Sequence, residues 1–246
     1  MIRLFKCEFR KFKSTYINSL SFLGMLFPVF LVFIVFLVKK EDFIKMKAYD
    51  WDNFNRQLSM FFLFFVGPII TSFISVFTVY YEYQQLTIKN LLMSPHGRIP
   101  VILTKIVYIS VFILLQYAVV AAMNVLCAAL LGFDVTYSKV LEFTRQMLMS
   151  GLSTLMLVPL MMFITLLFKG FIPGMIMTVV GSMANVLMLN WEKSYIWPWS
   201  IPADIAFIAT KQAEMNIMYP VTFACVYFTV FMVITFVYFS VADQNV

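Results

Sequence analysis

The chain has 246 residues, of which 62% are hydrophobic and 12% charged, and its formal net charge is +6. A soluble domain is about 45–50% apolar and about 25% charged, so the composition excludes one soluble core with a solvated surface. Lipid must cover most of the outside, and continuous apolar runs of roughly 20 residues indicate helices rather than the alternating strands of a barrel. We expect an all-α integral membrane protein in a single domain, 1–246.

The first segment, 1–16, is predicted to be an amphipathic helix in the membrane interface, with a plain topogenic tail as the alternative. Apolar residues recur in it at helical spacing, and basic residues occupy the other faces. The apolar set is Ile2, Phe5, Phe9, Phe12 and Tyr16, and the basic set is Arg3, Lys6, Arg10 and Lys13.

Six apolar runs then predict six transmembrane helices, each near the roughly 20 residues that cross a bilayer core. The expected spans are about 17–38, 59–80, 103–131, 147–168, 171–190 and 220–240. The third should begin near Pro100 and carry Lys105 on its first turns. Lys and Arg are equally numerous on the two sides, but the basic cluster before the first helix favours both termini in the cytoplasm.

The loop between the second and third runs has a helical pattern of its own. Ile88, Leu91 and Leu92 form one apolar face of a short helix, and Ser94-Pro95-His96-Gly97 forms a turn. Such a helix either presses on a cytosolic partner or lies on the lipid surface.

The stretch 191–219 precedes the last run and is aromatic and proline-containing. Trp and Tyr favour the membrane interface, and Pro198 and Pro202 interrupt a regular helix. A short re-entrant or interfacial element and an ordinary aromatic belt both fit this pattern.

Deeper inside the runs, the polar residues are uncharged. Gln116 and Asn124 lie eight residues apart, hence on one face of the third helix, and Asn185 lies in the fifth. They either hydrogen-bond between helices or line a substrate path. Gly174 and Gly181, seven apart, allow close helix approach.

Several kinds of chemistry are missing from the sequence. Apart from Lys105, the runs contain almost none of the acidic, basic and histidine side chains that ion and proton pathways need. No phosphate-binding Gly-x-x-x-x-Gly-Lys-Ser/Thr motif occurs, so we expect the chain not to hydrolyse ATP. With His96 as the only histidine, we expect no metal site, no bound cofactor and no catalytic triad. The basic residues adjoin apolar runs, which indicates topology signals rather than nucleic-acid binding.

The loop and the start of the third run resemble the ABC-2 type permeases, the six-helix membrane subunits of ATP-binding-cassette transporters. In that family an acidic residue precedes a short helix ending in Leu-Leu, followed by a small residue, Pro, a basic residue and a Lys that opens the third span. The matching residues are Glu82, Leu91, Leu92, Ser94, Pro95, Arg98 and Lys105. Leu86-Thr87 replaces the usual Gly-Thr step.

The resemblance implies a coupling helix at 82–95 that docks on an ATPase subunit. Two permease subunits, identical or homologous, would form the pathway, and two ATPase subunits would bind ATP and Mg. The 1–16 helix would be the connecting helix. The implied coupling residues are Glu82, Thr87, Ile88, Leu91, Leu92, Pro95 and Arg98. The implied extracellular re-entrant gate, in 191–219, contains Trp197, Pro198, Trp199 and Pro202.

Within that family, the size of the chain and the Trp197–Pro202 stretch look like permeases of lantibiotic-immunity and bacitracin-resistance exporters. The implied cargo is a peptide antimicrobial removed from the membrane. The alternative is a membrane accessory or scaffold protein that transports nothing. An integral-membrane enzyme is disfavoured by the missing catalytic groups.

Overall fold

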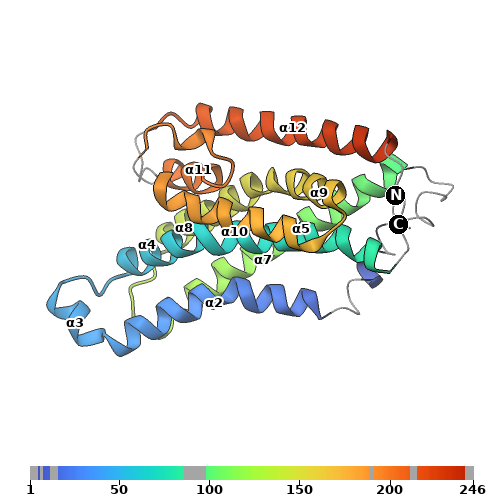
Figure 1. Cartoon of the computed structure of the whole chain (residues 1–246). Coiled ribbons are helices and arrows are strands. Elements are labelled where there is room, and N and C mark those ends of the chain that lie inside the picture. Colours follow the sequence, from blue (N-terminus) through green and yellow to red (C-terminus); the bar gives the residue numbers. More distant parts are fainter. Residues whose placement is uncertain are drawn as a thin grey trace.

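The structure, a computed structural model, describes Phe5 and residues 8–11, 16–85, 98–188, 191–210 and 215–241. These ranges form a bundle of helices and contain no strand (Figure 1). Six helical stretches are long and apolar enough to cross a membrane, which confirms the expected six-span, all-α fold. They are Ile17–Val38, Trp51–Gln84, Ile99–Leu130, Tyr137–Phe168, Phe171–Met188 and Met218–Phe239.

The second and fourth stretches each consist of more than one element. A π-helical segment separates α4 from α5, and a short break separates α8 from α9. The elements in chain order are α2 (Ile17–Val38), α3 (Lys40–Lys45), α4 (Trp51–Phe61), η1 (Phe62–Val66), α5 (Gly67–Gln84), α7 (Arg98–Leu130), α8 (Tyr137–Thr154), α9 (Leu157–Phe168), α10 (Phe171–Met188), η2 (Ser194–Ile196), α11 (Ile201–Ala209) and α12 (Met218–Val241).

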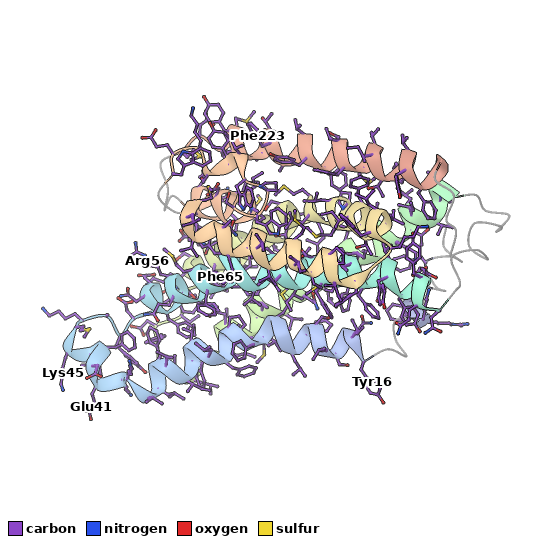
Figure 2. All side chains as sticks on the ribbon, viewed as in Figure 1. Tyr16, Glu41, Lys45, Arg56, Phe65 and Phe223 are labelled. Carbon is purple, nitrogen blue, oxygen red and sulfur yellow. The ribbon has the colours of Figure 1, made fainter. Side chains whose placement is uncertain are left out.

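The long helices run side by side, with α2 and α12 along opposite sides of the bundle (Figure 1). α2 packs on α4 and α7, α12 packs on α9, and α5 packs between α9 and α10. The beginning of α2 and the end of α12 lie at one end of the bundle, whereas α3 and α11 lie at the other. Side-chain sticks show Tyr16 at the first end and the charged Glu41 and Lys45 at the second (Figure 2).

The core is aromatic and aliphatic, and the outside is apolar as well. Phe36, Phe54, Phe62 and Tyr117 are fully buried. By contrast, only 6% of the apolar window of α12 is buried inside the bundle. An apolar surface of this kind is what a lipid-facing helix presents.

Two spans are longer than the sequence indicated. The second begins at Trp51 rather than near 59, and the fourth begins at Tyr137 rather than near 147. Both helices start with amphipathic turns, which an apolar window leaves out. In α4, Asp50 accepts a hydrogen bond from the Asn53 backbone N–H and caps the helix, and Phe54 is buried.

Prolines account for both irregularities in the long spans. Pro68, just after η1, has no N–H to donate to the Phe64 carbonyl, so the regular α-helical hydrogen bond is missing there. The π-helical turn η1 occupies this region. Pro159 stands in the first turn of α9, and the preceding Leu155 and Met156 form tight bonds to the Leu152 and Ser153 carbonyls.

Candidate functional site

A cluster of four charged side chains, three of them buried, joins three segments at the end of the bundle where α5 ends and α7 begins. Lys105 of α7 donates from Nζ to Glu82 Oε1 of α5 at 2.6 Å and to Glu8 Oε1 of the N-terminal segment at 3.0 Å. Lys11 of the same N-terminal segment also pairs with Glu82. The cluster therefore ties the N-terminal segment to both helices that flank residues 86–97.

Because most of these groups are buried, the loss of any one ion pair would be costly in free energy. Glu82 is 2% exposed, Lys105 4% and Glu8 8%. Two carboxylates and two ammonium groups balance one another, and the Lys11 side chain, 25% exposed, lies at the edge of the cluster. Taking a charge out of water costs several kcal/mol unless it is paired and hydrogen-bonded. Each member of the cluster thus depends on the others.

Local sequence places the members of the cluster. Glu82 lies in the last turn of α5, and Lys105 lies about two turns into α7, which begins at Arg98 as the position of Pro100 predicted. Around the cluster, Lys11 Nζ lies 5.1 Å from the centre of the Tyr81 ring. Phe5 packs edge-on against Tyr108, with ring centres 6.2 Å apart. Apolar and cationic contacts thus hold the N-terminal segment beside α5 and α7.

Most of the predicted coupling residues lie outside the described residues. These are Thr87, Ile88, Leu91, Leu92 and Pro95. Glu82 is described and lies inside α5, with its side chain turned into the charge cluster. Arg98 is the first residue of α7. The coupling role of this set stays a prediction; of the predicted 82–95 segment, the structure describes residues 82–85, and α5 ends within them at Gln84.

Sequence reasoning did not single out Glu8 or Lys11. Glu8 is the only acidic residue in the otherwise basic segment 1–16, and that isolation was the available signal. In the structure this single carboxylate pairs with the buried Lys105, which accounts for an acidic residue in a segment that is otherwise basic. Within the described ranges, no group of His, Cys, Asp and Glu is arranged to hold a metal ion.

The polar residues of the third span connect helices. Gln116 Nε2 donates to Ser21 Oγ of α2 at 2.8 Å, and Asn124 Nδ2 donates to Asn55 Oδ1 of α4 at 2.6 Å. Both amides are fully buried. These bonds fit the interpretation as interhelical hydrogen bonds; a part in a substrate path stays a prediction.

Asn185 links the π-helical turn of the second span to the segment after α10 through two hydrogen bonds. Its Nδ2 donates to the Phe64 carbonyl at 2.9 Å and to the Trp199 carbonyl at 3.1 Å. The Phe64 carbonyl is the one that Pro68 leaves without its usual helical donor. Because a bare backbone carbonyl is costly away from water, Asn185 compensates for the proline.

The predicted gate residues pack against α10. Trp199 is 3% exposed, and Trp197 Nε1 donates to the Gly181 carbonyl at 3.0 Å. Pro202 stands in the first turn of α11, where a missing N–H costs nothing. Pro198 precedes Trp199 in the connection from η2 to α11. The structure thus forms a short 3-10 turn and a helix in 191–219; α11 packs on α8 and α12. The gate role stays a prediction.

The Trp199 ring packs directly against the backbone of α10 at Gly181. Replacing this glycine should therefore destabilise the fold. A Cβ at Gly181 would lie 2.5 Å from the ring carbons of Trp199. We expect Gly181→Ala to cost about 1–3 kcal/mol through overpacking. Thermal unfolding in detergent measures the loss. Gly170→Ala is the matched control, because the nearest atoms there are at an ordinary 3.5 Å; an equal loss in both variants would contradict the packing argument.

The bundle and its composition define the class: a multi-pass membrane protein with six spanning helices. Comparison with known proteins supplies the family. Residues 4–185 match the model of the ABC-2 family transporter proteins, and the chain belongs to that family. It is also 29% identical over 143 residues to a bacitracin transport permease protein of Bacillus licheniformis, a match covering 58% of this chain and 69% of the relative. No solved structure matches.

Family membership makes the chain a membrane subunit of a transporter, and it implies two partners, an ATPase and the lipid bilayer. The resemblance inferred from Glu82, Pro95 and Lys105 is thereby confirmed at the level of the family. The matched region contains the N-terminal segment from residue 4, the charge cluster, the first four spans and the fifth span as far as Asn185.

Proposed function

We propose that this chain is the permease subunit of an ATP-binding-cassette exporter that removes peptide antimicrobials, of the bacitracin or lantibiotic type, from the membrane. A separate ATPase subunit, in two copies, would bind ATP and Mg and supply the energy. A second permease, identical or homologous, would complete the pathway. The similarity to a bacitracin transport permease supports the choice of cargo.

The charge cluster is the observation that carries the coupling part of this proposal. Residues 86–97 leave from α5 and return into α7, and Glu82 and Lys105 join those two helices directly. Glu8 and Lys11 add the N-terminal segment. A partner that displaces residues 86–97 would therefore move α5, α7 and the N-terminal segment together, because separating any of them leaves a buried charge without its counter-ion.

The proposed orientation follows from the same cluster. An even number of spans puts the beginning of α2 and the end of α12 on one side, which is the side of the cluster (Figure 1). Since ATPase subunits work in the cytoplasm, we place this end and both termini there. The 191–219 segment, with η2 and α11, then lies at the opposite, extracellular end.

Reconstitution of the chain tests the proposed function. The chain is placed in lipid vesicles with a candidate ATPase subunit, and movement of labelled bacitracin across or out of the bilayer is followed. We expect movement that requires ATP hydrolysis and both proteins. A non-hydrolysable ATP analogue and vesicles lacking the chain are the controls. Stable assembly with the ATPase but no nucleotide-dependent movement of any peptide would favour the accessory-protein alternative.

A further inference from the structure

A cavity of about 200 Å³ lies between α4, η1, α10 and α11, at the end of the bundle opposite the charge cluster. Methionine and phenylalanine side chains, such as Met60 and Phe64, form much of its wall. Arg56, Ser194, Ser200 and Asp204 provide its polar groups. Arg56 projects from α4 toward this end (Figure 2).

The two charged groups of the cavity do not neutralise each other. Asp204 Oδ2 accepts a hydrogen bond from Ser194 Oγ at 2.8 Å. No cation in the described part of the chain forms an ion pair with Asp204, and no described carboxylate pairs with Arg56. Among the described residues, the cavity thus presents a carboxylate and an exposed guanidinium, neither of which forms an ion pair.

The surroundings of Asp204 disfavour its charged form. Burial raises the pKa of Asp204 to about 6, although the Ser194 hydrogen bond opposes the rise. A raised pKa means that the surroundings of a carboxyl group do not offset the cost of removing its negative charge from water. A bound cation would supply that compensation.

From the opposite and unpaired charges in one apolar-walled cavity, we propose that it binds a compact zwitterion. The ammonium group of the ligand pairs with Asp204, its anionic group pairs with Arg56, and the hydrocarbon between them lies on the methionine and phenylalanine wall. A cation alone would face Arg56, and an anion alone would face Asp204, so either is disfavoured.

The volume limits the ligand to a small group. A cavity of about 150 Å³ holds one benzene molecule, so about 200 Å³ admits a headgroup or a side chain rather than a whole peptide. The shared chemistry has two sources: a zwitterionic lipid headgroup, with phosphate as the anion, or an amino-acid-like group, with carboxylate as the anion. The inference rests on the proposed function only for the use of this site in transport.

Binding is measured on the purified chain in dodecyl maltoside, which has no zwitterionic headgroup, as the ligand-induced rise in melting temperature. The probes are phosphoethanolamine and 4-aminobutyrate, with butylammonium and butyrate as single-charge analogues. We expect at least one zwitterion to stabilise the chain at a lower concentration than both analogues. The more effective zwitterion identifies the source. No stabilisation by either, or equal stabilisation by the analogues, would overturn the inference.

Two variants locate the site. Asp204→Asn and Arg56→Gln should each weaken binding by about tenfold or more, since each removes a charge-assisted bond. Asp134→Asn and Arg145→Gln make the same charge changes at exposed positions outside the cavity and should leave binding unchanged. Equal weakening by these controls would contradict the assignment.

The wild-type chain provides a test without any substitution. Zwitterion binding should be strong above about pH 6, where Asp204 is ionised, and should fall as the pH drops through that value. Binding that is constant from pH 5 to 8 would overturn the role of Asp204. Loss of binding with ATP-driven peptide movement intact would refute this inference alone, whereas binding without such movement would refute only the proposed function.

Discussion

Glu82→Gln should destabilise the chain more than any other single change considered for the bundle. The substitution keeps the shape of the side chain but removes the carboxylate that Lys105 and Lys11 share. Among the described residues, Lys105, which is 4% exposed, would keep Glu8 alone as its counter-ion. Breaking a buried pair by removing one partner costs about 3–5 kcal/mol, because an uncompensated charge stays buried. Denaturant or thermal unfolding in detergent measures the loss.

The exposed ion pair between Asp52 and Lys139 provides the matched control. Its atoms are 3.3 Å apart, and the side chains are 72% and 41% exposed. Asp52→Asn makes the same acid-to-amide change and should cost about 0–1 kcal/mol, the range of solvent-exposed pairs. Unfolding energies that fall equally in Glu82→Gln and Asp52→Asn would show that the cluster does not hold α5, α7 and the N-terminal segment together.

The double substitution Leu91→Asp, Leu92→Asp should abolish ATP-driven transport while the membrane bundle stays folded. These leucines supply the apolar face of the predicted coupling helix, and burying a carboxylate in an apolar protein groove is strongly unfavourable. We expect loss of co-purification with the ATPase subunit and transport reduced to the level of vesicles without ATP. Size-exclusion behaviour and melting temperature report whether the bundle is intact.

Leu91→Ile, Leu92→Ile is the control for that experiment. It keeps the apolar character and the volume of both side chains, so assembly should be retained or only modestly weakened. Normal assembly and transport in the double Asp variant would contradict the coupling role of 82–95 and leave the charge cluster with a purely structural role.

The spans were predictable because a helix that crosses lipid needs about 20 consecutive apolar residues, and such a run can be recognised in the sequence alone. The starts of the second and fourth spans were not predictable, because the first turns of α4 and α8 are amphipathic. In α4, Trp51 and Phe54 lie on the buried face, and polar residues occupy the other face. The segment 191–219 was recognised as irregular from Pro198 and Pro202. That Trp199 fills the gap at Gly181 depends on how two separate elements pack, which no local pattern records.

The charge cluster was only half visible in the sequence. Glu82 and Lys105 were noticed as parts of a family pattern, yet their direct pairing depends on the packing of α5 against α7. The partner of Lys105 in the N-terminal segment, Glu8, lies 97 residues away along the chain. Likewise, Asn185 bonds the Phe64 carbonyl across 121 residues. Composition and spacing identify such groups as unusual, but only the fold decides which of them meet.

Cross-linking tests most directly whether energy enters through the connection between the second and third spans. The native residues Cys7, Cys127 and Cys225 are first replaced by serine or alanine. Leu91→Cys and, at the opposite end of the bundle, Lys47→Cys are then treated with a short bifunctional thiol reagent in the presence of the ATPase subunit. We predict that Leu91→Cys joins the ATPase and Lys47→Cys does not; attachment through Lys47→Cys alone would contradict the account.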